Sequence, residues 1–468
     1  MIPAFGEIAA IRERLFDLSD EQFAKLVGFM ERTRDLSTGR SVSNEALDAM
    51  RPRLRVSRPP RRLNVERIFC RPFEDVLHSG PDQSWRAGRI ARAAIEPCWA
   101  VVSQRIAPSL LAEIRRDIGE LTVADLNWPL RFGPPLWTAA RAAFDAILGE
   151  ADADRAAHAA LVGSLGGAAG EASFRLMARM LAIAEIVEEL RYILSPKPLA
   201  ALDISHAAAV SGQFKALAAA KATLWEPLAY FVIARMAEPI ALARAYGGAA
   251  CADAGLHFLG VTASKVTIAD LGATLGELDA VVAGTPDAAA AVASRGEIAA
   301  DQIAKLREGV RERKFTASMA EIDRMQQGLR DAVSRNVLEG TGSLIAGSLE
   351  TAAPADDAAG EAARDALRQT AEARAHALWK CARFAGKIGM DRELAQTVKS
   401  VEDEAGQLVL DQIAALRRGS GRPDDDAIDS VQASLVHAVR VVELVAGPER
   451  ANALRKRGFE AIERLRAA

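Results

Sequence analysis

Apolar side chains recur every three to four residues along most of the chain, which is the spacing of amphipathic helices. Near the start, Ser19 to Gln22 has the spacing of a capping box. The apolar stripe that follows it consists of Phe23, Leu26, Val27 and Met30. Another stripe runs along 171–194, between a glycine-rich break at 163–170 and the Ser195-Pro196 step. These patterns predict a chain built mainly of helices.

Proline, glycine and capping residues indicate where the helices begin and end. Asn64 and Pro286 predict helix starts, and Thr267 to Asp270 has the composition of another cap. We expect loops at 127–135, which holds three prolines, and at 340–347, which holds three glycines. In the last part of the chain the predicted helices are 297–314, 316–337, 357–386, 391–418, 426–446 and 448–466.

The regular second half contrasts with a less regular first half, and this difference predicts four parts. They are an N-terminal helical module at 1–50, a basic linker at 51–62, an alanine-rich helical region at 63–250, and a C-terminal part at 262–468. Short joints between long helices in the last part are typical of a helical bundle or of a helix-pair solenoid. No fixed repeat period in the sequence decides between these two.

Composition supports an all-α fold. Alanine accounts for 95 of the 468 residues, against 24 aromatic residues (15 Phe, 6 Trp and 3 Tyr). Alanine is the strongest helix former, whereas strands favour aromatic and β-branched residues. We therefore predict an all-α, multi-helix array.

The bulk charge and the cysteines favour a cytoplasmic protein. The formal net charge is −3 and the pI is near 6.2, so contact with nucleic acid or an anionic membrane would need a local basic patch. The four cysteines lie far apart, which favours a reducing compartment over a disulfide framework. Charges interrupt every long apolar stretch, including Trp225 to Tyr246, so we expect no membrane span and no secretory signal.

One segment departs from this background. From Arg51 to Arg71 the chain has eight arginines and a single acidic residue, Glu66. The arginines are Arg51, Arg53, Arg55, Arg58, Arg61, Arg62, Arg67 and Arg71. Prolines and mutual repulsion predict an exposed basic linker instead of a continuous helix. Three interpretations stay open: a solvated linker, an arm that binds phosphates, and a docking sequence for an acidic partner surface.

The linker leads into a segment that is unusually aromatic for this chain. Ile68, Phe69 and Phe73 lie here at close spacing. We expect these three side chains to dock the linker onto the body of the protein.

Catalytic and metal-binding signatures are weak in this sequence. No histidine has a glutamate three residues before it, which is the spacing of a di-iron bundle. The Gly340 to Gly347 segment lacks the lysine of a phosphate-binding loop. We therefore predict no catalytic residues, no metal site and no cofactor.

These observations favour a non-enzymatic scaffold or adaptor that binds protein partners and uses the basic arm for an acidic partner. The alternative is a nucleic-acid-associated protein whose arginines in 51–71 contact phosphates. An enzyme is the third hypothesis, with Trp225, Tyr230, His206 and Glu226 as the lining of a cavity. The sequence leaves self-association open.

Overall fold

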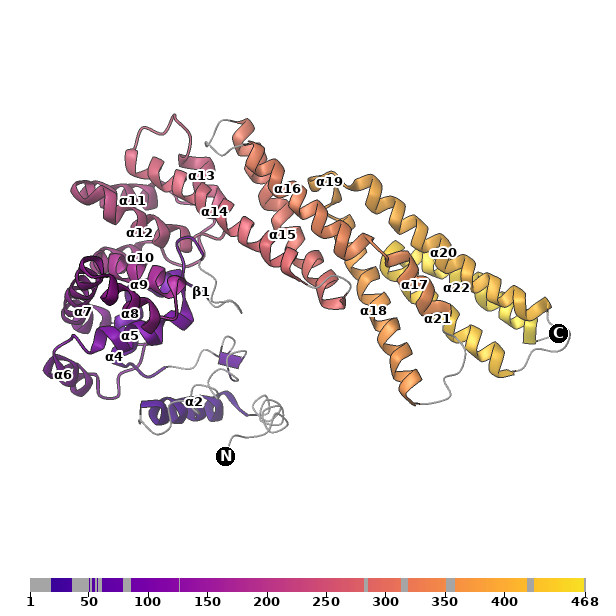
Figure 1. The fold of residues 1–468 in the computed structure, drawn as a ribbon, viewed down its shortest axis with the longest axis horizontal. Helices are drawn as coiled ribbons and strands as arrows, with labels where there is room; N and C mark the ends of the chain where they lie inside the picture. The colour runs from indigo at the N-terminus through magenta and orange to yellow at the C-terminus, as the bar shows by residue number, and fades with distance from the viewer. Residues whose placement is uncertain are drawn as a thin grey trace. The chain divides into compact units, whose positions relative to one another are not determined.

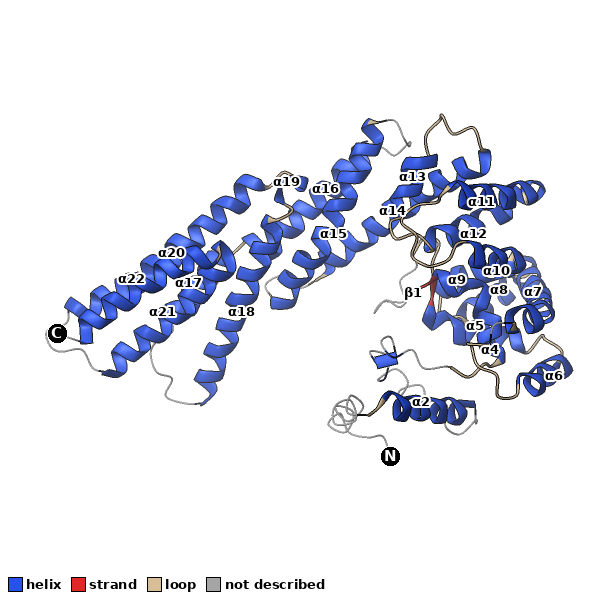
Figure 2. Ribbon diagram, turned by 180° about the vertical axis from the view of Figure 1, so that it is seen from behind, coloured by secondary structure: helices blue, strands red, loops and turns tan. Residues whose placement is uncertain are grey.

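The computed structural model describes most of the 468-residue chain. The described residues are 18–35, 50, 53–54, 57, 61–78, 86–125, 127–281, 285–312, 319–350, 358–418 and 425–466. Almost all of them lie in helices, and the predicted all-α, multi-helix array is confirmed. Within the described part, the only paired strands are two-residue segments, β1 (Leu77–His78) and β2 (Ile90–Ala91), which pair in parallel (Figure 2).

The chain divides into two compact units, Met1–Ala237 and Glu238–Ala468, which we call unit 1 and unit 2 (Figure 1). The α-helices of unit 1 are α2 (Asp20–Asp35), α4 (Val65–Cys70), α5 (Ile95–Ser103), α6 (Pro108–Ile118), α7 (Trp128–Ala153), α8 (Arg155–Ser164), α9 (Ala168–Leu181), α10 (Ala184–Ile193), α11 (Ile204–Ala216) and α12 (Lys221–Ala234). Its 3-10 helices are η1 (Arg71–Val76), η2 (Arg92–Ala94) and η3 (Ala218–Ala220).

Helix α2 is the described core of the N-terminal module. Its capping box forms as predicted, because the Ser19 amide donates to the Gln22 side chain and the Gln22 amide donates to Ser19. Phe23 and Val27 of this helix are fully buried, and Met50 packs with them in a small cluster. Residues 1–17 and 36–49 of the predicted module lie outside the described residues.

The predicted loop at 127–135 is wrong, because helix α7 runs through it from Trp128. Pro134 and Pro135 lie inside this helix and cannot donate hydrogen bonds to the carbonyls of Leu130 and Arg131. Both of these residues are exposed, so water can satisfy their carbonyls. The helix therefore continues through two prolines that lie beyond its first turn.

The single helix predicted at 171–194 is divided in two. Helix α9 ends at Leu181 and α10 begins at Ala184. Ile183 lies at the joint and is buried. The break contains neither glycine nor proline. The apolar pattern predicts a continuous helix here, and burial of Ile183 at the joint favours the interruption instead.

Unit 2 is an array of longer helices. They are α13 (Ile240–Tyr246), α14 (Ala254–Ala280), α15 (Pro286–Arg311), α16 (Met319–Val333), α17 (Thr341–Glu350), α18 (Ala358–Ala382), α19 (Ala385–Ile388), α20 (Asp391–Arg418), α21 (Asp425–Ala446) and α22 (Pro448–Arg466). A short π-helix, η4 (Ser334–Leu338), follows α16. Helices α20, α21 and α22 lie side by side, and α18 packs against α15 and α21 (Figures 1 and 2).

Two predictions within unit 2 are wrong. Thr267 does not cap a helix but lies inside α14, where its hydroxyl donates to the Ala263 carbonyl at 2.8 Å; Asp253 provides the N-cap. The predicted joint at 340–347 contains helix α17. Gly340, with a φ of 70°, ends the preceding segment, and burial of Ile345 and Leu349 keeps the following residues helical despite two further glycines.

The division at Ala237/Glu238 lies upstream of the boundary predicted between 250 and 262. Helix α13 and the first turns of α14 therefore belong to unit 2. In the part of the chain that the structure describes, no helix combines the length and the apolar character needed to cross a bilayer.

Candidate functional site

The arginine segment is only partly described, and the arginines that are described lie against the protein. Arg51, Arg55 and Arg58 lie outside the described residues. Arg53 and Leu54 are helical, contrary to the extended linker that was expected. The Arg53 guanidinium donates to the Leu18 carbonyl, lies 3.3 Å from an Asp20 oxygen, and covers the Phe23 ring at 4.5 Å. This arginine therefore holds the N-terminal module together.

The end of the segment is joined to the loop after α6. The Arg61 carbonyl accepts from the Val123 amide, and the Leu63 amide donates to the Leu121 carbonyl, each at 2.8 Å. The Arg62 side chain donates to the Gly119 carbonyl and lies 3.5 Å from a Glu120 oxygen. Arg67 lies half-buried on α4, and its amide donates to the capping side chain of Asn64.

The three residues expected to dock the linker lie in the core of unit 1. Ile68, Phe69 and Phe73 are fully buried. The Phe69 ring lies 5.3 Å from Phe73 and 4.8 Å from Trp99, and Trp137 donates its indole hydrogen to the Ile68 carbonyl at 2.8 Å. All three side chains therefore pack within the core of unit 1.

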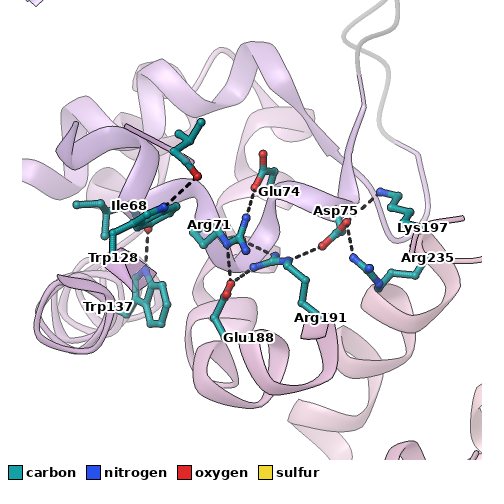
Figure 3. A network of polar contacts seen from close by, with 11 residues as sticks. Ile68, Arg71, Glu74, Asp75, Trp128, Trp137, Glu188, Arg191, Lys197 and Arg235 are labelled. Atoms are coloured by element: carbon teal, nitrogen blue, oxygen red, sulfur yellow. Dashed lines mark hydrogen bonds and ion pairs between the residues drawn. The ribbon is translucent and has the colours of Figure 1, made fainter. Parts of the chain in front are cut away.

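A network of ion pairs surrounds Asp75 of η1 (Figure 3). Its carboxylate accepts from Arg191 of α10 at 2.9 Å, from Lys197 at 3.0 Å, and from Arg235 after α12 at 3.1 Å. Asp75 and Arg235 are only 9% and 5% exposed. Arg235 also donates twice to the Leu194 carbonyl. One carboxylate thus joins η1 to α10, to the loop after α10 and to the residue that follows α12, all more than a hundred residues further along the chain.

Arg71 extends this network on its other side (Figure 3). Its guanidinium donates to Glu188 of α10 at 2.9 Å and to Glu74 at 3.1 Å. Glu188 also pairs with Arg191, so the two clusters are continuous. Arg71 lies over the Trp128 ring at 5.5 Å. Its charge is therefore balanced within unit 1.

Electrostatics explain why this network stays ionised. Burial alone would raise the pKa of Asp75, but the charges and hydrogen bonds of Arg191 and Lys197 outweigh burial and lower the pKa to about 2. Burial and the neighbouring Arg71 lower the pKa of Arg191 to about 10. Both groups remain charged near neutral pH, so the network serves to hold the unit together and not to transfer protons.

In unit 2, three polar side chains lie in the order of a serine–histidine–carboxylate triad. The Ser348 hydroxyl lies 3.0 Å from Nε2 of His437, and Nδ1 of His437 lies 3.6 Å from a Glu372 oxygen. The three residues come from α17, α21 and α18. Burial lowers the pKa of His437, which keeps the imidazole neutral near pH 7.

This arrangement does not fit nucleophilic catalysis. Ser348 is 1% exposed and His437 is 6% exposed, so a substrate carbonyl has no route to the hydroxyl. Ser348 also lies inside α17, where neighbouring amides are used by the helix and cannot form an oxyanion hole. Ser348 and His437 form a buried hydrogen bond between α17 and α21, and the half-exposed Glu372 of α18 lies beside the ring.

A further surface is formed by exposed and half-buried side chains of α18, of the turn after it, and of α21. We call it the aromatic–basic surface, and it consists of His376, Trp379, Lys380, Arg383, Val436 and Arg440. The His376 and Trp379 rings stack at 6.0 Å with an angle of 17°, and Arg383 lies over the Trp379 ring at 5.4 Å. Trp379 is 41% exposed and Val436 is 55% exposed. A large apolar group is thus held in a fixed orientation at the surface.

Two residues of the enzyme hypothesis, Tyr230 and Glu226, contact each other. Tyr230 donates to Glu226 at 2.6 Å, and Glu226 pairs with Arg179. The Trp225 ring packs against Phe214, and His206 lies beside Asp203 at the start of α11. Among the described residues, no group of three or more histidines, cysteines or carboxylates is placed to hold a metal ion.

Comparison with protein families, curated proteins and solved structures finds no match to this chain. The function is therefore argued from the site geometry.

Sequence reasoning missed both the Asp75 network and the aromatic–basic surface. The partners of Asp75 are far away in the sequence, so no pattern of neighbouring residues predicts these ion pairs. The surface did leave a signal, because His376, Trp379 and Arg383 are three and four residues apart within the helix predicted at 357–386. That spacing places an aromatic pair and a cation along one side of a helix.

Proposed function

We propose that this protein is a non-enzymatic adaptor that binds a protein partner through the aromatic–basic surface. The observation that carries the proposal is the exposed Trp379 side chain, stacked on His376 and covered in part by Arg383. Tryptophan and arginine are the residues most enriched among those that dominate binding energy at protein interfaces.

The preorganisation of Trp379 also supports a binding role. A side chain that is already held by its neighbours loses little conformational freedom when a partner covers it. Val436 extends the exposed apolar area onto the neighbouring helix α21. Together they provide an apolar centre bordered by charged side chains, which is the usual organisation of an interface.

The nucleic-acid alternative has less support from the described arginines. Arg53, Arg62 and Arg71 each lie against a carboxylate of unit 1. A cation that is already paired releases fewer counterions when it meets a phosphate, so it adds less to the affinity.

The test replaces Trp379 by Ala in the full-length protein. The tagged protein is used to capture partners from a native lysate treated with nuclease, and the captured proteins are quantified by mass spectrometry. We expect Trp379→Ala to lose partners that the wild type retains. Ile298→Ala is the matched control, because Ile298 is an exposed apolar residue on α15 of the same unit. Equal capture by the wild type and Trp379→Ala would refute the proposed function.

A further inference from the structure

Three of the described cations lie near Trp379, and two of them face carboxylates. Lys380 follows it on α18, Arg383 lies in the turn just after that helix, and Arg440 of α21 is close enough to His376 to affect its charge. Arg440 shares its charge with Glu443 at 3.1 Å, and Arg383 lies 3.8 Å from Glu297. Within the described part of the chain, Lys380 forms no ion pair. Burial, Lys380 and Arg440 together lower the pKa of His376, as expected where the local potential is positive.

The apolar groups of the surface are spaced along two parallel helices. His437 of α21 pairs with Glu372 of α18, and Arg440 of α21 acts on His376 of α18. Both helices therefore run in the same direction, with Val436 roughly level with residue 371. At 1.5 Å per residue, Val436 and Trp379 are offset by about 12 Å along the helix axes. The axes of packed helices are also about 8–10 Å apart, so the two side chains are separated by about 15 Å. Two apolar side chains eleven residues apart lie on the same face of a partner helix and span about 16.5 Å, which fits this separation.

We propose that the aromatic–basic surface binds an acidic amphipathic helix of a protein partner. Its apolar side chains would contact Trp379 and Val436. Its carboxylates would pair with Lys380, and with Arg440 in competition with Glu443. This inference rests on the proposed adaptor function and adds the chemical class of the partner.

The charge of the surface favours a protein helix over a nucleic acid. Among the described residues, the cations that border it are Lys380, Arg383 and Arg440, and each of the two arginines already faces a carboxylate of its own. Acidic residues also outnumber lysine and arginine in the whole of unit 2, which opposes a long polyanion. An amphipathic helix that carries only a few carboxylates beside its apolar stripe can be neutralised by the cations of this surface.

The experiment uses two synthetic probes and the full-length protein. One probe is a fluorescent amphipathic peptide of about 18 residues with leucines on one face and glutamates on both flanks; in the other probe, glutamine replaces every glutamate. Binding is measured by fluorescence anisotropy at low and high salt. We expect the glutamate peptide to bind about tenfold more tightly than the glutamine peptide, and this preference to shrink at high salt.

Three variants distinguish the proposed adaptor function from the proposed acidic character of the partner. Trp379→Ala should weaken both peptides, by about 30-fold for the glutamate peptide. The double variant Lys380→Glu/Arg440→Glu should remove the preference for the glutamate peptide and leave the glutamine peptide bound. Arg392→Glu/Lys399→Glu on α20 is the control for the same change in net charge, and it should keep the preference. Circular dichroism checks that every variant is folded.

Each outcome has a distinct meaning. Equal affinity for the two peptides, with binding still dependent on Trp379, would overturn the acidic partner and leave the adaptor function standing. Tighter, Trp379-dependent binding of a mixed-sequence oligonucleotide would overturn the protein helix in favour of nucleic acid. Peptide binding that ignores Trp379→Ala, together with unchanged lysate capture, would refute the adaptor function itself.

Discussion

Asp75 shows how a single carboxylate can decide the stability of a helical unit. It accepts hydrogen bonds from Arg191, Lys197 and Arg235, and two of these cations are almost fully buried. A buried guanidinium without a counter-ion is costly, because its lost hydration is not replaced. The free energy lost when Asp75 is removed is therefore expected to exceed the net stabilisation that the intact ion pairs provide.

Asp75→Asn should lower the free energy of unfolding of unit 1 by about 3–5 kcal/mol, since it leaves the buried Arg235 without a counter-charge and Arg191 with Glu188 alone. Chemical denaturation followed by tryptophan fluorescence measures this change. Asp145→Asn removes an exposed carboxylate that pairs with Arg141 on α7, and it should cost less than about 1 kcal/mol. Similar costs for the two variants would contradict the role given to Asp75.

His437 should make unit 2 sensitive to acid. Burial lowers its pKa from the usual 6.5; Arg368 of α18 acts in the same direction, Glu372 of α18 opposes it, and Ser348 of α17 contacts the ring. The unfolded chain therefore binds the proton more readily than the folded one. Stability is complete above about pH 6.5 and falls as the pH decreases from there.

Urea unfolding at several pH values between about 7.5 and 5 tests this expectation. His437→Gln should lose part of the acid sensitivity of the wild type. Glu372→Gln should increase that sensitivity, because it removes the carboxylate that favours the protonated ring. The same pH dependence in the wild type and His437→Gln would show that other groups cause it.

At the scale of helices, local signals predicted starts better than interruptions. The capping box at Ser19, the cap at Asn64 and the start at Pro286 are confirmed, because each depends on residues within one turn. The break at Ile183 and the continuation of α7 through Pro134 depend instead on what packs against the chain. Burial at Ile345 and Leu349 likewise outweighs the glycines of α17. Tertiary contacts of this kind are not visible in a short window of sequence.

Gly260 of α14 lies very close to the backbone at the end of α13. A Cβ atom added there would lie 2.3 Å from the backbone nitrogen of Gly247 and 2.6 Å from the carbonyl carbon of Tyr246. Backbone atoms cannot rotate away as a side chain can, so α13 would have to move. The absence of a side chain at Gly260 is therefore required for the packing of α13 on α14.

Gly260→Ala should destabilise unit 2 by about 1–3 kcal/mol, because overpacking exceeds the gain in helix propensity. Gly276→Ala lies in the same helix with open space around it, and it should stabilise the unit by up to about 1 kcal/mol. Thermal unfolding of the two variants gives the comparison. A stabilising effect of Gly260→Ala would mean that α13 does not pack this closely.

At the scale of the whole molecule, the all-α class followed from composition and periodicity, whereas the limits of the units did not. The alanine-rich stretch suggested a change near 250–262, but compactness depends on which helices pack together. Helix α13 packs on α14, and α14 on α15 and α16, so all four belong to one unit. A change in amino-acid composition along the chain does not show which helices pack against each other.

Two fragments test where unit 2 begins. Residues 238–468 should fold with a single cooperative thermal transition, because they include α13 and the whole of α14. Residues 262–468 should unfold less cooperatively and at a lower temperature, since the fragment lacks α13 and the first turns of α14. Circular dichroism melting curves give the comparison. Equal transitions in the two fragments would place the boundary near 262.

The burial of α14 also has a consequence for synthesis of the protein on the ribosome. Between Ala254 and Ala269 its only fully charged residue is Lys265, and its buried side chains contact helices on both sides in the chain. Of these, α13 emerges from the ribosome before α14, but α15 and α16 emerge after it and end only at Val333. At about 5–20 residues per second, the apolar surface of α14 stays uncovered for about 3–10 s. During that interval the nascent chain presents a binding site for chaperones, so slower translation of 281–333 should increase aggregation of the newly made protein.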